Sequence, residues 1–446
     1  MKRKNIVIMG AAGRDFHNFN VCFREDPWSR VRAFTATQIP YIAKRRYPPI
    51  LAGSLYPKGI PIFDETELPA LVKELRINEV VFAYSDISHI ELMHKVSLCL
   101  ALGVDFRFLG PEATMLKSRR PVISVCAVRT GAGKSQVTRY LCECINGKGF
   151  KPVVIRHPMP YGDLVEQAVQ RFAHLDDLTL KRCSIEEREE YEPLINQGVT
   201  VYSGVDYEKI VRAAEGEGDL LIWDGGNNDF PFLRSDLEIT LVDPLRPGHE
   251  TAYFPGEVNV RRARVIVINK ANTVAENVLQ RFEESLTGIN PSAVIVQTAS
   301  EISVSDPSAI TGKKVLVVED GPTITHGGMS TGAGFAAARK YSAAEIVDPR
   351  PFATNSISAV YRDYPHIGPV LPAMGYSPEQ IEDLQRTLEL SSCDLVLAAT
   401  PIDLRRIMTI TKPVVRVYYD LVEMADERLK SCLNEFLKDR MVGRKY

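Results

Sequence analysis

The amino-acid sequence predicts an α/β fold in which helices cover parallel sheets. Short apolar segments typical of buried strands alternate along the chain with longer segments of helical periodicity. Strands that alternate with helices in this way form parallel sheets. We therefore expect a Rossmann-like N-terminal domain over residues 1–118. Its strands are predicted at 5–9, 31–36, 79–84 and 104–109, and its helices at 64–75 and 88–102.

A second α/β unit is expected over residues 119–303. The polar segment 175–195 within it contains the acidic run Glu186 to Glu192 and predicts a helical excursion over the sheet. A solvated charged face is the simplest interpretation of such a run. The strands of this unit are predicted at 122–127, 152–156, 219–224, 239–242, 264–269 and 293–297.

The last stretch, residues 304–446, is predicted to be a C-terminal α/β region. The sequence leaves open whether it is a separate domain or extends the sheet of the second unit. The apolar positions of 421–438 have helical spacing, which indicates core packing. Strands are predicted at 314–319, 394–398 and 413–418, and helices at 333–342, 378–390 and 421–438.

The composition excludes several classes of protein. A net charge of −2 argues against nucleic acid as a partner. No apolar stretch is long enough to span a bilayer, so we expect neither a membrane partner nor a secretion signal. The eight cysteines are scattered without a Cys-x-x-Cys pair, which is typical of reduced thiols in the cytoplasm and gives no structural zinc site. A homodimer is the default expectation.

The most informative segment follows the predicted strand 122–127. The strand ends in a loop that reads Arg129-Thr130-Gly131-Ala132-Gly133-Lys134-Ser135 and precedes a predicted helix. This order is typical of a phosphate-binding loop, in which backbone N–H groups wrap phosphates, the lysine reaches the β- and γ-phosphates and the serine binds Mg²⁺. The usual first glycine is Val128 here, and Arg129 stands where a subgroup of P-loop proteins carries an extra lysine. We expect a P-loop NTPase domain with a mostly parallel sheet.

A strand that ends in an acid supplies the second part of the expected site. Asp219 to Asp224 is apolar between its ends, and Gly225 and Gly226 follow. P-loop enzymes need such an acid to hold Mg²⁺, and ligands of α/β sheets bind at the carboxyl ends of strands. We therefore assign Mg²⁺ to Ser135 and Asp224. The polar residues at 227–229 are candidates for positioning water or substrate.

The segment Asn269-Lys270-Ala271-Asn272 also follows a predicted strand. GTPases have Asn-Lys-x-Asp at this point, and the aspartate accepts two hydrogen bonds from guanine. Asn272 has no charge and presents a donor beside its acceptor. We therefore expect Asn269, Lys270 and Asn272 to contact the nucleotide, with ATP preferred and GTP possible.

Glycine-rich and basic strand ends predict a second ligand that is small, anionic and phosphorylated. One such loop contains Arg246 and His249, and another runs from Glu319 to Gly334. Glycines expose backbone N–H groups to anions. The expected substrate-binding residues are Arg246, Thr323, Gly327, Gly328 and Arg350, and the expected catalytic residues are Arg129, Lys134, Asp224, His249 and His326.

Several of these segments together resemble the cyclic 2,3-diphosphoglycerate synthetases and their bacterial relatives, which are often labelled GTPases. The resemblance runs over nearly the whole chain. It rests on the P-loop 129–135 and on the segments 13–20, 186–193, 246–250, 319–323, 325–329, 347–351 and 371–376.

The resemblance implies an ATP- and Mg²⁺-dependent ligase. In this chemistry the γ-phosphoryl group passes to one phosphate of 2,3-bisphosphoglycerate, and the neighbouring phosphate then closes an intramolecular phosphoanhydride. Relatives carry aspartate at the position of Asn272, so this chain departs from them at the base-reading loop. Two alternatives remain: a regulatory or metal-chaperone NTPase, and a nucleotide sensor whose N-terminal unit binds a dinucleotide or coenzyme A.

Overall fold

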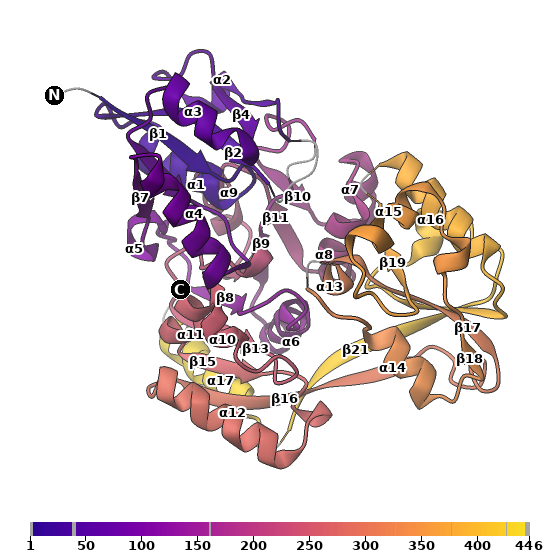
Figure 1. The fold of residues 1–446 in the computed structure, drawn as a ribbon. Coiled ribbons are helices and arrows are strands. Elements are labelled where there is room, and N and C mark those ends of the chain that lie inside the picture. Colours follow the sequence, from indigo (N-terminus) through magenta and orange to yellow (C-terminus); the bar gives the residue numbers. More distant parts are fainter. Residues whose placement is uncertain are drawn as a thin grey trace.

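Two sheets built mostly of parallel strands carry the fold of the computed structural model (Figure 1). The structure describes residues 3–37, 42–159, 162–325, 327–375, 377–424 and 426–441. The N-terminal sheet has the order β3-β4-β2-β1-β5-β7, and only β3 runs antiparallel to its neighbour. Its strands are β1 (Lys4–Met9), β2 (Ser29–Ala36), β3 (Arg46–Tyr47), β4 (Ile60–Asp64), β5 (Glu79–Phe82) and β7 (Asp105–Phe108).

The large sheet has 13 strands, and one path runs through it in the order β10-β11-β9-β12-β8-β13-β15-β16-β21-β20-β17-β18, with β19 beside β17. Antiparallel pairs occur at β10–β11 and β16–β21. Its strands are β8 (Val122–Ala127), β9 (Pro152–Arg156), β10 (Gln170–Phe172), β11 (Thr200–Ser203), β12 (Leu220–Asp224), β13 (Leu237–Val242), β15 (Val265–Ile268), β16 (Val294–Val304), β17 (Lys314–Asp320), β18 (Glu345–Ile346), β19 (Leu371–Ala373), β20 (Leu395–Ala399) and β21 (Val414–Glu423).

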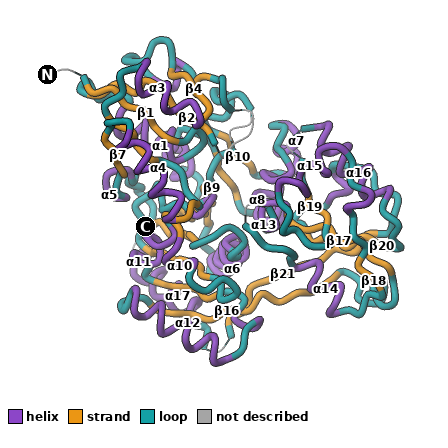
Figure 2. The backbone as a smooth tube through the Cα atoms, in the orientation of Figure 1, coloured by secondary structure: helices purple, strands orange, loops and turns teal. Residues whose placement is uncertain are grey.

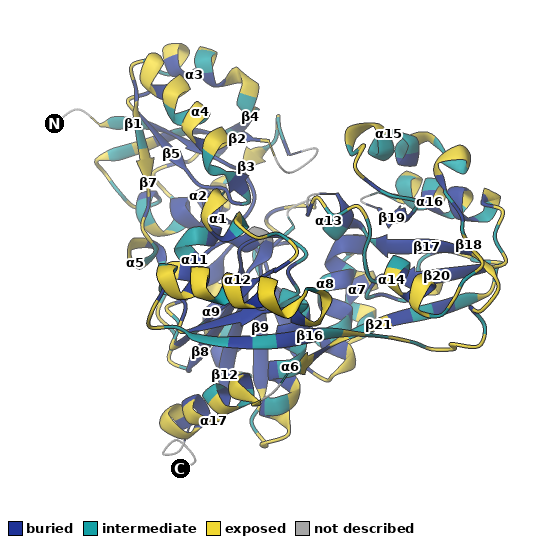
Figure 3. Ribbon diagram, turned by 60° about the horizontal axis from the view of Figure 1, so that its bottom comes forward, coloured by how far each residue is buried: buried dark blue, intermediate teal, exposed yellow. Residues whose placement is uncertain are grey.

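Helices cover both faces of these sheets, and their exposed sides form much of the surface (Figure 3). The helices are α1 (Arg14–Asn18), α2 (Pro49–Ala52), α3 (Leu68–Glu74), α4 (His89–Ala101), α5 (Pro111–Thr114), α6 (Lys134–Asn146), α7 (Leu175–Leu180), α8 (Ile185–Asn196), α9 (Tyr207–Glu215), α10 (His249–Ala252), α11 (Gly256–Arg262), α12 (Glu276–Ile289), α13 (Gly321–Ile324), α14 (Ala333–Lys340), α15 (Asn355–Asp363), α16 (Pro378–Leu390) and α17 (Arg428–Met441).

The strands around the glycine loop form because their side chains are apolar on both faces. Every residue of β8 and β12 is buried, as expected for parallel strands covered on two sides. One face packs against α6, α8 and α17, and the other packs against α9. The predicted mixed α/β fold with a large, mostly parallel sheet is confirmed, and β8 and β9 have the predicted bounds.

The prediction of a helix over residues 421–438 is wrong for the first residues of this range. Residues 421–423 are the last residues of β21, and α17 begins only at Arg428. The strand continues because β21 pairs with β16 from Val304↔Val417 to Thr298↔Glu423. This ladder satisfies the backbone groups that a helix would otherwise satisfy within itself.

The long strands β16 and β21 connect the C-terminal elements to the sheet around the glycine loop (Figure 1). The C-terminal helix α17 then returns to pack against the core beneath that loop through its buried Leu429 and Leu433. A two-stranded pair, β6 (Ile87–Ser88) with β14 (Tyr253–Phe254), connects the N-terminal unit to the same region. Loops drawn in teal surround α6 and α13 (Figure 2). Among the described residues, no helix is long and apolar enough to cross a lipid bilayer.

A buried histidine lies where the N-terminal unit meets the large sheet. His17 is 1% exposed, its Nε2 lies 2.6 Å from the carbonyl oxygen of Thr114, and its ring stacks on Phe232 at 4.4 Å. Burial, helped by the nearby Arg14 guanidinium, lowers the pKa of His17 to about 3. The folded protein therefore holds this imidazole neutral.

This histidine predicts acid sensitivity. The unfolded chain binds a proton at His17 below about pH 6.5, whereas the folded chain does so only near its lowered pKa. As the pH is lowered through this range, the free energy of unfolding therefore decreases by up to about 1.4 kcal/mol per pH unit. Between pH 6.5 and 4.5, the melting temperature of His17→Gln should fall less steeply than that of the wild type. The exposed control His94→Gln should follow the wild type, and equal slopes for all three proteins would contradict this account.

Candidate active site

The glycine loop has the conformation that its sequence predicts. It connects β8 to α6 through residues 128–133, with a positive φ of 79° at Gly131 and 108° at Gly133. A Cβ at Gly133 would lie 2.1 Å from Nδ2 of Asn269, and one at Gly131 would lie 3.2 Å from Cγ2 of Thr323. Backbone angle and close approach both require glycine here.

Lys134 begins α6, and its ammonium group donates to Oδ1 of Asn228 at 2.9 Å. Asn228 is fully buried and has a φ of 59°. Its Nδ2 lies 3.4 Å from Oγ1 of Thr130, so the asparagine connects two residues of the glycine loop, Thr130 and Lys134. Burial lowers the pKa of Lys134, and the carboxylate of Asp224 opposes that shift. Asn228 thus positions the lysine, while the side chain of Asn227 lies outside the described residues.

Asp224 ends β12 and is fully buried. One of its oxygens forms an ion pair with Arg156, which also binds Glu190 at 2.8 Å. The other oxygen, Oδ1, has no hydrogen-bond partner among the residues that the structure describes. A carboxylate oxygen of this kind beside Lys134 fits Mg²⁺, which prefers oxygen ligands. Asp224 is therefore a side chain that would hold the ion, and the hydroxyl of Ser135, at the start of α6, stays a predicted ligand.

Arg129 is paired with an acid from the N-terminal unit. Its Nε lies 2.8 Å from Oδ1 of Asp86, its Nη1 lies 3.2 Å from Nδ1 of His249, and its guanidinium stacks over Tyr253 at 3.8 Å. Asp86 also accepts a hydrogen bond from the Thr130 hydroxyl at 2.9 Å. No pattern in the sequence pointed to Asp86, because this residue lies in another unit and in no motif.

The loop of residues 269–272, which follows β15, also holds the glycine loop in place. Lys270 donates to the carbonyl oxygen of Gly131 at 2.7 Å and to Asp243 at 2.9 Å. Asn269 donates to the carbonyl oxygen of Ala132 at 2.9 Å. The structure thus brings these two predicted residues to the phosphate-binding loop, whereas Asn272 is exposed in a short 3-10 turn beside it.

Two predicted substrate residues connect the C-terminal region to the glycine loop. Arg246 donates through Nη1 to the carbonyl oxygens of Thr130 and Gly327, both at 2.9 Å. Thr323 lies against Gly131. Gly328 has a φ of 67° with open space beside it. His326 lies outside the described residues.

The other predicted anion-binding groups have partners within the chain. The backbone N–H groups of Gly332, Gly334 and Phe335 donate to the Glu319 carboxylate at 2.8–3.1 Å. Burial raises the pKa of Glu319 to about 7, although these three bonds favour its charged form. Arg350 is exposed and pairs with Asp348 at 3.1 Å. No contact of the described residues joins Arg350 to the glycine loop.

Helix α8 corrects the expectation of a solvated acidic face. Several acids of α8 are buried because the helix lies between two hydrophobic cores. Tyr191 packs in the core beneath the glycine loop, and Ile185 packs against the C-terminal strands. The carboxyl group of Glu189 faces that of Asp320, and burial together with this neighbour raises the pKa of Glu189 well above its usual range. The four acids of α8 that are only 3–6% exposed are Glu186, Glu187, Glu189 and Glu192.

The loop between β8 and α6, its lysine and the acid at the end of β12 define a P-loop protein. Comparison with known proteins then places it more narrowly. The chain is 56% identical over 438 residues, 98% of each protein, to "Arginine synthetase ArcE" of Thermococcus kodakarensis. The chain belongs to the family that contains this synthetase and the cyclic 2,3-diphosphoglycerate synthetases, so the resemblance indicated by the motifs is confirmed.

Other similarities are partial. A cyclic 2,3-diphosphoglycerate synthetase of Thermococcus sibiricus is 30% identical over 106 residues, 24% of each protein. That of Pyrococcus furiosus is 23% identical over 219 residues, 43% of this chain and 48% of the relative. The crystal structure of LpxK from Aquifex aeolicus with ATP aligns with 82% of this chain and 99% of its own, at a TM-score of 0.43 and 14% identity. No family model matches the chain.

The position of Lys134 yields a direct test of the loop. Lys134→Ala should lower the turnover of nucleoside triphosphate by roughly 100-fold or more, because one preorganised charge on the transferring group is lost. The fold should be kept, because the Lys134 side chain is only partly buried and forms no ion pair with the described residues. Steady-state hydrolysis and circular dichroism measure the two effects. Lys148→Ala, an exposed lysine just beyond α6, is the matched control. Turnover retained in Lys134→Ala would contradict the assignment.

Proposed function

We propose that this chain is an ATP- and Mg²⁺-dependent ligase that makes arginine. The observation that carries the proposal is the 56% identity to ArcE across 98% of both proteins. ATP is proposed over GTP because Asn272 offers guanine no carboxylate. A P-loop site performs phosphoryl transfer, so the chemistry of arginine formation must begin with such a transfer.

Arginine differs from the ureido amino acid citrulline by one nitrogen in place of the ureido oxygen. The ureido oxygen attacks the γ-phosphorus, the β–γ anhydride bond breaks and ADP leaves. The lone pair of ammonia then attacks the ureido carbon, and the C–O bond breaks as phosphate leaves with its electron pair. Citrulline, ammonia and ATP thus give arginine, ADP and phosphate, with no change of oxidation state.

The residues around the glycine loop have clear roles in this sequence. Lys134 offsets the charge that builds up on the transferring phosphoryl group. Asp224 and Ser135 hold Mg²⁺, which supplies charge neutralisation on the phosphate oxygens when it is bound. Arg129 and Arg246 keep the loop in shape through the contacts described above, so their main role is positional.

An acidic pair near the loop favours ammonia as the second reactant. Thr323 touches Gly131 and donates to Asp320 at 2.6 Å, and Asp320 faces Glu189. No ion pair with a basic side chain satisfies Glu189 or Asp320 among the described residues. Two neighbouring carboxyl groups that share one proton can bind ammonium and accept a proton from it, which produces the nucleophile.

The formation of cyclic 2,3-diphosphoglycerate is the second candidate. The partial matches to its synthetases favour it. Its substrate carries two phosphates and a carboxylate, and like charges repel strongly at short range in a dry site. The acids of α8 and Asp320 would add to that repulsion. The N–H groups at 332–335 would not relieve it, because they already bind Glu319.

The two candidates are distinguished by their products. We expect the purified protein, given ATP, Mg²⁺, ammonium and L-citrulline, to form arginine, ADP and phosphate in equal amounts, as measured by amino-acid analysis and phosphorus NMR. Omission of citrulline or ammonium should abolish the arginine. A cyclic phosphoanhydride from 2,3-bisphosphoglycerate, without arginine, would establish the second candidate. Hydrolysis without either product would point to the regulatory NTPase.

A substitution tests the acidic pair. Glu189→Gln keeps the shape of the side chain but removes its basic oxygen, so arginine formation should fall by roughly 100-fold, the usual worth of a general base. The KM for ammonium should rise, while the KM for ATP should stay within about twofold. Glu208→Gln is the control, because its side chain is 61% exposed. An unchanged rate and ammonium KM in Glu189→Gln would exclude this role.

A further inference from the structure

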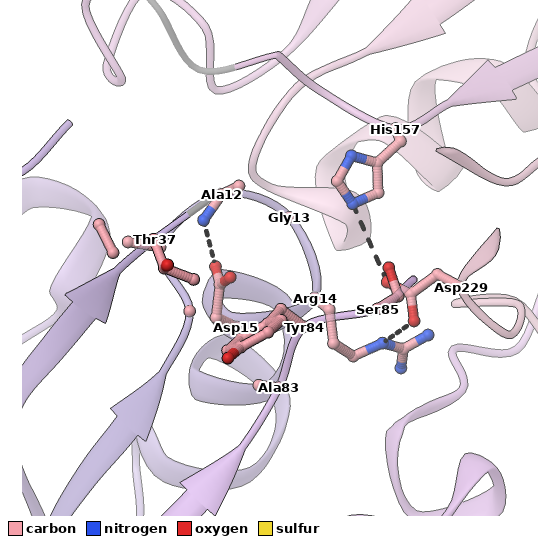
Figure 4. A pocket seen from close by; sticks show the side chains of 13 residues that line it. Ala12, Gly13, Arg14, Asp15, Thr37, Ala83, Tyr84, Ser85, His157 and Asp229 are labelled. Atoms are coloured by element: carbon pink, nitrogen blue, oxygen red, sulfur yellow. Dashed lines mark hydrogen bonds and ion pairs between the residues drawn. The ribbon is translucent and has the colours of Figure 1, made fainter. Parts of the chain in front are cut away.

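A pocket lies apart from the glycine loop, at the carboxyl edge of the N-terminal sheet (Figure 4). The loops that follow β1, β2 and β5 line it. β1 is flanked by β2 on one side and by β5 on the other. The strand order therefore changes direction at β1, because β2 to β4 extend the sheet on one side of it and β5 and β7 on the other. Open α/β sheets bind ligands in the crevice at such a switch point.

The opposite wall of the pocket comes from the P-loop unit. His157 and Asp229, which follow β9 and β12, face the N-terminal loops, with His157 Nε2 4.0 Å from Oδ2 of Asp229. Asp229 directly follows Asn228, the residue that holds Lys134. One lining residue of the pocket is therefore the chain neighbour of the asparagine that binds Lys134, the group expected to contact the γ-phosphate.

The charges of the pocket argue against a phosphate ligand. Asp15, 2% exposed, accepts the backbone N–H of Ala12 at 2.6 Å and so occupies the loop donor that a phosphate would use. The guanidinium of Arg14 is taken by Asp229 at 3.0 Å and by the carbonyl oxygen of Phe230. Arg14 and Asp229 thus neutralise each other, and Asp15 is left facing the pocket without an ion-pair partner among the described residues. This favours ammonium, guanidinium or ureido N–H groups over the phosphates of a dinucleotide or coenzyme A.

We propose that this pocket binds the amino-acid substrate, an α-amino acid with a ureido or guanidino side chain. Its α-ammonium group binds Asp15, and its ureido end lies beside His157 and Asp229, toward the γ-phosphate. The inference rests on the proposed function and adds to it the place of the acceptor. In this arrangement the amino acid approaches from the N-terminal side, and ammonia approaches from the acidic pair on the C-terminal side.

Binding measured by calorimetry tests the site independently of turnover. With ADP present, the wild type should bind L-citrulline. Asp15→Asn should weaken citrulline binding by about tenfold or more, while the Kd of ADP stays within twofold. Thr37→Trp should block the pocket in the same way; Thr37 is an exposed lining residue, so this variant remains informative if Asp15→Asn folds poorly. The control is Asp105→Asn, whose side chain is 76% exposed in the same unit.

The outcomes distinguish the pocket from the function. Weakened citrulline binding in the pocket variants alone supports the assignment. A wild type that makes arginine, with a citrulline Kd that is unchanged in Asp15→Asn and Thr37→Trp, overturns the pocket and leaves the proposed function standing. A wild type that neither binds citrulline nor makes arginine overturns both.

Discussion

The guanidinium of Arg156 is the contact on which the site depends. It lies directly opposite Asp224 in the parallel pairing of β9 with β12, and it also binds Glu190 of α8. Arg156 is 2% exposed and Asp224 is fully buried. Removal of one member of such a buried pair costs about 3–5 kcal/mol, because a charge is then left without a partner. Without this cation the acidic helix could not pack against the strand that carries the candidate Mg²⁺ ligand.

The single positive charge of Arg156 does not neutralise the two carboxylates that it binds. Arg156 binds Asp224 and Glu190, and the residue before Glu190 in α8, Glu189, faces a further carboxyl group, that of Asp320. The region beyond the glycine loop is therefore suited to incoming positive charge. The loop itself presents backbone amides and Lys134, which suit phosphates. This separation of charge matches a reaction that brings a triphosphate and ammonia together from opposite sides.

The sequence was most informative where structure is local. The strand, loop and helix around Lys134 were predicted closely, because the conformation of a glycine loop and the burial of a strand depend mainly on residues that are adjacent in the sequence. The burial of Glu189 was not, because a charge run cannot reveal that two cores enclose its helix. Asp86 was missed for the same reason: its ion pair with Arg129 joins two units, and no motif encodes it. Asp15 lies in the segment 13–20, but that segment alone does not reveal that the residue lines a pocket. The extension of β21 through residue 423 likewise depends on its long-range pairing with β16.

The dipeptide Asn228-Asp229 suggests an order of binding. In this structure Lys134 donates to Asn228, which has no exposed surface. A γ-phosphate would draw the ammonium group of Lys134 toward itself and leave Oδ1 of Asn228 without that donor. A buried acceptor without a partner costs about 1–3 kcal/mol. The ureido N–H groups of an amino acid in the adjacent pocket could satisfy this oxygen, so nucleotide bound first would favour acceptor bound second.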